Sequence, residues 1–135
     1  MANEEKGYKT RTYLEKDAPH LVSTKEKLDS IGKGMCLAKW TQTTIHLQLG
    51  HTHSCHHPRT HKISTKEIAR NPSALHNTTY KKIRRREMLN GKRPPECEYC
   101  WNVEDSSDRF SDRVFKSSES WSLPHYDEIK NADWR

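Results

Sequence analysis

The arrangement of the cysteines constrains the fold of this chain more than any other feature of its sequence. There are four of them, Cys36, Cys55, Cys97 and Cys100. The last two form a CxxC pair (GKRPPECEYC), a spacing that lets both sulfurs turn toward one centre. Thiolates are soft ligands that suit zinc and iron–sulfur clusters, and four of them complete a closed coordination shell. We therefore expect the cysteines to share one site for an inorganic group.

The low apolar content of the chain gives such a site a structural role. Hydrophobic residues make up only 31% of the 135 residues, and charged residues make up another 31%. Little apolar surface is thus available to offset the entropy of ordering the chain, and small domains of this kind usually need a metal or disulfides.

The sequence also predicts a compartment. The opening segment MANEEKGYKTRTY does not resemble a signal peptide, and no apolar run approaches the about 18 residues of a membrane span. We therefore expect a cytoplasmic protein, in which clustered cysteines bind metal more often than they form disulfides. Disulfides remain the minor alternative.

Hydrophobic periodicity and turn signals predict a small α+β fold. Apolar and polar residues alternate over residues 44–49 before Gly50, which predicts a β-hairpin within residues 40–55. Helices are predicted over residues 23–30, 64–70 and 73–90, the first two from capping-box patterns.

On the longest predicted helix, Leu75, Thr79, Ile83 and either Glu87 or Met88 follow helical spacing and should face the core. The basic residues between Lys81 and Arg86 should face solvent.

The positions of the cysteines predict how the chain is divided. Residues 1–34 are expected to form a polar, partly disordered lead-in. Residues 35–103 should form the four-cysteine domain, with one β-hairpin and one or two helices. Residues 104–135 turn acidic and serine-rich and are expected to be a polar tail or linker.

The ligand spacing leaves two kinds of site open. In sequence order it reads C-x18-C-x41-C-x2-C. Zinc ribbons and RING domains usually supply paired knuckles, whereas this chain has one knuckle and two cysteines that arrive singly, an arrangement more typical of an auxiliary cluster site. Trp40 and Trp101 flank the cysteine segments and are expected to shield the site from water.

Histidines near the end of the hairpin offer further ligands. They are His51, His53, His56, His57 and His61. Cys55 and His57 together with the CxxC pair would satisfy a Cys₃His zinc site, and a separate metal site is a second alternative. We favour a solvated loop in which one or two histidines donate hydrogen bonds to cluster sulfurs.

One segment carries a family resemblance. CLAKWTQT, the hairpin with a cysteine at its end, and the helix leading into ML-x-G-x-R-P-x-E-C-x-x-C-W resemble the N-terminal cysteine-rich region of twitch-type radical SAM proteins, including phage-encoded members. The resemblance covers about Met35 to Trp101 and extends loosely through SDRVFKSSESW.

In that family the region is similar to a half-SPASM module, which holds an auxiliary iron–sulfur cluster beside the radical SAM barrel. The resemblance implies that the cysteines ligate a 4Fe–4S cluster that serves as electron relay or structural brace. It also implies that the partner is a radical SAM barrel in the same or a neighbouring polypeptide.

The sequence departs from the family pattern at several positions. Lys39 stands where the family has proline in C-x-x-P-W, and His56 stands where it has the second cysteine of C-C. No CxxxCxxC triad, which would leave one iron open for S-adenosylmethionine, is present in the sequence. We therefore assign no catalytic residues, and we expect a fragment, a split gene product or a stand-alone module that is not catalytic alone.

The charge of the chain suggests an alternative partner. The formal net charge is +6, and the run KKIRRR could contact a phosphate backbone. A bound 4Fe–4S cluster with its thiolates would lower the net charge to about +4, an ordinary value for a soluble protein. A zinc-stabilised module that binds nucleic acid or protein is therefore the second interpretation, and nucleic acid is the less favoured partner.

Overall fold

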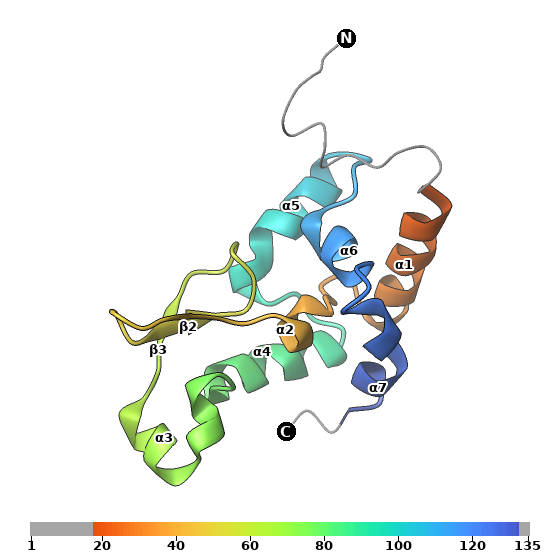
Figure 1. Ribbon diagram of the computed structural model, residues 1–135. Coiled ribbons are helices and arrows are strands. Elements are labelled where there is room, and N and C mark those ends of the chain that lie inside the picture. Colours follow the sequence, from red (N-terminus) through yellow and green to blue (C-terminus); the bar gives the residue numbers. More distant parts are fainter. Residues whose placement is uncertain (1–17, 133–135) are drawn as a thin grey trace.

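A computed structural model of the chain describes residues 18–132 (Figure 1). Its helices are α1 (Ala18–Ile31), α2 (Ala38–Thr41), α3 (Thr65–Arg70), α4 (Thr79–Leu89), α5 (Glu98–Ser106), α6 (Asp112–Ser117) and α7 (Tyr126–Lys130). Its strands are β1 (Thr44–His46), β2 (His51–His53) and β3 (His61–Lys62), and its 3-10 turns are η3 (Pro72–Leu75), η4 (Pro95–Cys97) and η5 (Leu123–His125). The predicted α+β class is confirmed, with more helices than expected.

The predicted hairpin is confirmed. Strands β1 and β2 pair antiparallel with His46 opposite His51, and Gly50 in the connecting turn has a φ of 66°. Left-handed backbone of this kind favours glycine. Leu47 and Leu49 lie in the turn and are 83% and 66% exposed, so the alternating segment continues past the end of the first strand. The two-residue strand β3, which pairs with β2, was too short to predict.

Capping side chains decide where the helices begin. The Ser64 hydroxyl accepts a hydrogen bond from the Glu67 backbone N–H at 3.1 Å, as the capping pattern predicts. The predicted helix over residues 73–90 is instead divided into η3 and α4. The first segment ends at Leu75, and Thr78 caps α4 by accepting from the Lys81 backbone N–H. The predicted helix over residues 23–30 lies inside the longer α1.

The expected orientation of α4 was wrong except at Met88. The buried residues of α4 are Lys81, Arg85 and Met88, whereas Ile83 is 42% exposed. The Lys81 ammonium donates to the Thr52 hydroxyl at 2.9 Å, and the Arg85 Nε–H donates to the Lys39 carbonyl at 2.9 Å. The surface against which α4 packs therefore offers oxygen acceptors. Cationic side chains can donate hydrogen bonds to these acceptors, whereas apolar side chains would leave them buried and unsatisfied.

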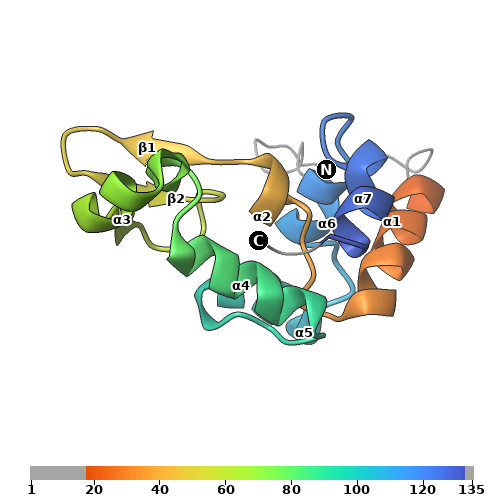
Figure 2. The same cartoon turned by 90° about the horizontal axis from the view of Figure 1, so that it is seen from below.

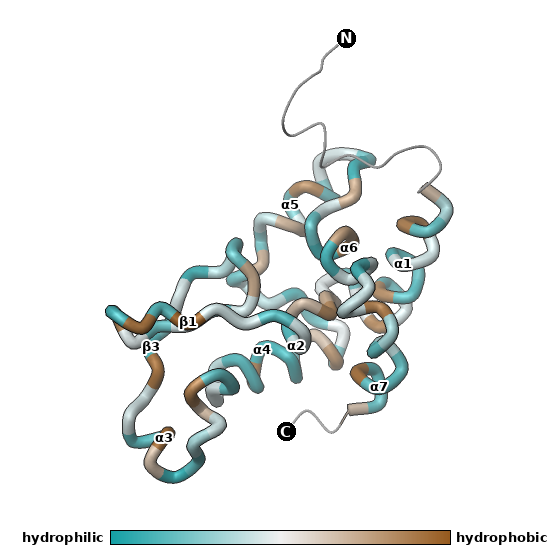
Figure 3. The backbone as a smooth tube through the Cα atoms, in the orientation of Figure 1, coloured by the Kyte–Doolittle hydropathy of each residue, from teal (hydrophilic) through white to brown (hydrophobic). Residues whose placement is uncertain are grey.

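The hydrophobic core extends beyond the predicted domain limits on both sides. Its buried members are Leu21, Leu28, Met35, Cys36, Leu37, Ala38, Met88, Val114, Tyr126 and Ile129. Within the described residues, the predicted lead-in thus contributes α1, and the predicted tail contributes α6 and α7. The prediction was too narrow because apolar residues are sparse and scattered along the chain (Figure 3), so no single segment looks like a core.

The elements are arranged with the sheet and α3 at one end, and with α1, α6 and α7 at the other (Figures 1 and 2). Helix α2 lies between these ends. No helix among residues 18–132 has both the length and the apolar character needed to cross a bilayer.

Two close backbone approaches bring the Cys36 segment against the loop before the CxxC pair. A Cβ atom on Gly32 would lie 2.6 Å from the Gly91 Cα. A Cβ atom on Gly34 would lie 2.6 Å from the Lys92 carbonyl oxygen and 2.7 Å from the Arg93 Cα. Only glycine permits this packing, because real Cβ contacts are not this short.

Arg113 connects three elements from the interior. Its side chain is 2% exposed; it donates to the Glu104 carboxylate at 2.8 Å and to the Asp29 carboxylate at 2.5 Å. It also donates to the Met35 carbonyl at 3.0 Å. Helices α1, α5 and α6 are thereby held around the segment that precedes Cys36.

Candidate metal centre

The four cysteines line one pocket. Cys36 precedes α2, Cys55 follows β2, Cys97 ends η4, and Cys100 lies in the first turn of α5. Segments far apart in the sequence thus bring the thiols together, as the sequence predicts. All four are free thiols rather than disulfides. Their role as ligands stays a prediction.

The pocket opposes ionisation of its thiols. Burial raises the pKa of Cys36 to about 11, and the nearby Cys55 and Cys100 add to the rise. Burial likewise raises the pKa of Cys97 to about 12, with Cys36 and Cys55 again contributing while Lys39 opposes. Thiolates gathered in such a place need a compensating positive charge, which a bound metal ion or cluster iron would supply.

Some compensation comes from the protein itself. The Ser117 hydroxyl donates to the Cys36 sulfur at 3.9 Å and accepts from the Leu37 backbone N–H at 2.9 Å. Burial also raises the pKa of Cys100, although hydrogen bonds from the Ser111 side chain and the Arg113 backbone counteract part of that rise.

Lys39, the departure from the family pattern, lies at this site. Its side chain is 4% exposed, lines the pocket and forms an ion pair with Glu96. Burial disfavours its charge, but Cys97 and Glu96 outweigh that effect and raise the pKa of Lys39 above its usual value. A fixed positive charge therefore lies beside the thiols.

Two buried hydrogen-bond donors in the pocket wall have no acceptor. The Ser54 hydroxyl and the Trp101 indole N–H are both buried without a hydrogen-bond partner in the described part of the chain. Nearly all buried donors in folded proteins are satisfied, so this pair needs an explanation. An acceptor within the pocket, such as the sulfide of a cluster, would provide one. Trp101 lines the pocket, and Trp40 packs, partly buried, against the core; that they shield the site from water stays a prediction.

The spacing of the thiols is wider than one zinc ion requires. Among the described residues, no three cysteine sulfurs lie within 4.8 Å of one another. Tetrahedral zinc with bonds of about 2.3 Å would bring sulfurs to about 3.8 Å apart.

The predicted histidines divide into two sets. His51 contacts the Thr60 hydroxyl at 2.9 Å, His61 contacts the Thr78 hydroxyl at 2.7 Å, and His53 contacts the Pro58 carbonyl at 3.2 Å. These three rings have local structural partners.

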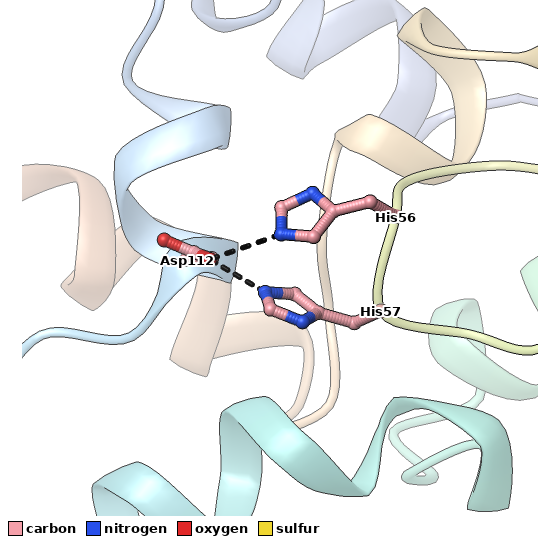
Figure 4. A group of neighbouring side chains, drawn as sticks. All are labelled: His56, His57 and Asp112. Carbon is pink, nitrogen blue, oxygen red and sulfur yellow. Dashed lines mark hydrogen bonds and ion pairs between the residues drawn. The ribbon is translucent and has the colours of Figure 1, made fainter.

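His56 and His57 instead turn toward Asp112 at the start of α6 (Figure 4). His57 also lines the cysteine pocket. The sequence pointed to both histidines but not to Asp112, which lies 55 residues after His57 in the predicted tail.

No family model, curated protein or solved structure matches this chain. Its function must therefore be inferred from the site itself.

Proposed function

We propose that this chain is an iron–sulfur module in which the four cysteines ligate a 4Fe–4S cluster. The observation that carries the proposal is the convergence of all four thiols, from distant segments, on one pocket. Thiolates are the usual ligands of such clusters, and four complete the shell.

Two features favour a cluster over a single zinc ion. The sulfurs are spaced more widely than tetrahedral zinc requires. Ser54 and Trp101 line the pocket, and their buried donors have no partner in the described part of the chain; hydrogen bonds to cluster sulfurs would satisfy them. Zinc brings no acceptor atom of its own. A zinc-stabilised module that binds nucleic acid or protein is thus the second candidate.

Ligation of every iron by the protein determines which reactions the proposed cluster can support. When bound, such a cluster supplies one-electron transfer, and with every iron ligated by protein it offers no open position for a substrate. The module would therefore act as an electron relay or a structural brace, in keeping with its resemblance to the auxiliary-cluster region of twitch-type radical SAM proteins. The proposed partner is a radical SAM barrel, and the proposed compartment is the cytoplasm.

The basic helix gives little support to a nucleic-acid function. Lys81 and Arg85 point into the protein, where they make buried hydrogen bonds. Arg84 pairs with Glu87 at 2.8 Å. The outward charge of α4 is therefore smaller than the run KKIRRR suggests, and phosphate binding depends on that outward charge.

Anaerobic purification of the full chain tests the proposal. Expected results are broad absorption near 400 nm, and about four irons and four sulfides per chain. Cys97→Ser and Cys100→Ser should lose this absorption. Ile63→Ala serves as the control, because Ile63 is buried but belongs neither to the pocket lining nor to the core cluster that contains Cys36. A colourless protein with one zinc per chain, or iron content unchanged in the cysteine variants, would refute the proposal.

A further inference from the structure

A second group of ligand atoms lies at the rim of the cysteine pocket. It consists of His56, His57 and Asp112, whose ligand atoms all lie within 4.8 Å of one another. The Asp112 Oδ2 atom lies 2.5 Å from the His57 Nε2 atom and 3.9 Å from the His56 Nε2 atom. Figure 4 shows both rings directed at the same carboxylate from one loop.

These distances suit a small divalent cation. Zinc bonds of about 2.0–2.2 Å to nitrogen and oxygen place neighbouring ligand atoms about 3.4 Å apart in a tetrahedron. The two observed separations lie on either side of that value, so modest side-chain rotation would equalise them. Two imidazoles and one carboxylate are also a donor set that borderline transition metals prefer.

The arrangement brings a second imidazole to the histidine–aspartate pair. The short contact joins His57 to Asp112, and the His56 ring, whose centroid lies 4.0 Å from that of His57, approaches the same oxygen. The His56 side chain is 57% exposed, whereas Asp112 is 10% exposed. A cation here would thus have two sheltered ligands and one ligand at the surface, with room for water as the fourth.

The surroundings hold two of the ligands in place. The His57 ring stacks on Tyr99 with centroids 4.0 Å apart and planes 16° from parallel. Asp112 lies between Ser111 and Arg113, which both hydrogen-bond the Cys100 thiol. The His57 ring therefore stacks on a residue inside the CxxC pair, and Asp112 lies between two residues that contact the second cysteine of that pair.

We propose that His56, His57 and Asp112 form a second metal site that binds Zn²⁺ or a similar divalent cation, separate from the four-cysteine site. Such an ion would fasten the loop after Cys55 to the first turn of α6, beside Cys100. It would fix the positions of Cys55 and Cys100, two of the proposed cluster ligands, relative to each other. The ion itself would not be bound by these cysteines.

Zinc binding to the full chain, purified anaerobically, tests this site. One equivalent of Zn²⁺ should bind, and X-ray absorption at the zinc edge should show only nitrogen and oxygen neighbours at about 2.0–2.2 Å. Because loss of even an outer-sphere partner weakens metal sites 10- to 100-fold, His56→Ala and Asp112→Asn should each weaken zinc binding by about tenfold or more. His125→Ala is the matched control, since His125 pairs with Glu128 at 3.0 Å and no third ligand joins them among residues 18–132.

The outcomes separate this site from the cysteine site. Zinc with sulfur neighbours at about 2.3 Å, no zinc binding, or equal binding in wild type and His56→Ala would overturn the inference. His56 is exposed enough that its replacement should leave the fold intact, so the result does not depend on Asp112→Asn. Iron and sulfide content, measured on the same samples, reports on the cysteine site independently.

Discussion

Replacing Gly34 by alanine should reduce both the stability and the iron content of the protein. The added methyl group would lie 2.6 Å from the Lys92 carbonyl oxygen and 2.7 Å from the Arg93 Cα. Because ordinary carbon contacts are about 3.5–4.0 Å, the two backbones must separate by roughly 1 Å. Both contacts are with backbone, which cannot rotate away, so we expect a cost of about 1–3 kcal/mol in the free energy of unfolding.

The same displacement should reach the cysteine site. Gly34 is two residues before Cys36, and Arg93 is four residues before Cys97. Separating these segments moves one thiol away from the others, so the cluster should be lost more readily than the fold. We expect wild-type secondary structure with less iron per chain.

Gly50→Ala is the control for this experiment. Gly50 has a positive φ of 66°, but no atom lies within 4 Å of the added Cβ. Its replacement should cost about 1–2 kcal/mol of backbone strain in the hairpin and leave iron content unchanged. Anaerobic thermal melts and iron analysis of both variants test this prediction. Wild-type iron and melting temperature in Gly34→Ala, or equal iron loss in both variants, would refute the reasoning.

Three further changes test other parts of the structure. Met88→Ala should lower the free energy of unfolding by about 2–5 kcal/mol in denaturant titrations, because Met88 is fully buried; a change below 1 kcal/mol would contradict the packing. Burial and then the charge of Lys81 lower the pKa of His61 to about 4. The unfolded chain takes up this proton near pH 6.5 and the folded chain only near pH 4, so stability should fall as pH drops through that window. His61→Gln should flatten this slope in melts between pH 4 and 6.5, and an unchanged slope would exclude His61 as its source. Lys39→Met removes the buried cation beside the thiols and should lower the reduction potential of the cluster. Redox titration measures this potential, with Arg70→Met as the exposed control. Equal potentials in the two variants would show that Lys39 does not act on the site.

The sequence predicted the elements of the fold better than their packing. Short-range signals sufficed for the hairpin around Gly50 and for the helix start at Ser64, because the groups that make these features lie within a few residues of each other. The orientation of α4 could not be predicted in this way. Lys81 is buried because acceptors such as Thr52 meet it across the fold, and no local pattern records them.

The residues of the candidate site were likewise only partly predictable from the sequence. The cysteines could be grouped from the sequence because thiols are rare in the chain and their chemistry is distinctive. Asp112 could not, since it is one of 18 acidic residues and its partner His57 is 55 residues away. The stacking of Tyr99 on His57 is likewise a product of the tertiary fold.

The position of Arg113 has a consequence for the order of folding. This guanidinium joins the Asp29 carboxylate, which precedes it by 84 residues, and Ser117 from the same helix reaches Cys36 across 81 residues. During synthesis α1 therefore emerges long before Arg113, and Cys36 emerges long before Ser117. Contacts this distant in sequence form late, because the loop between them must close first. Loading of the pocket should thus follow release of most of the chain from the ribosome, and until then the early thiols remain accessible to oxidants and to competing metals.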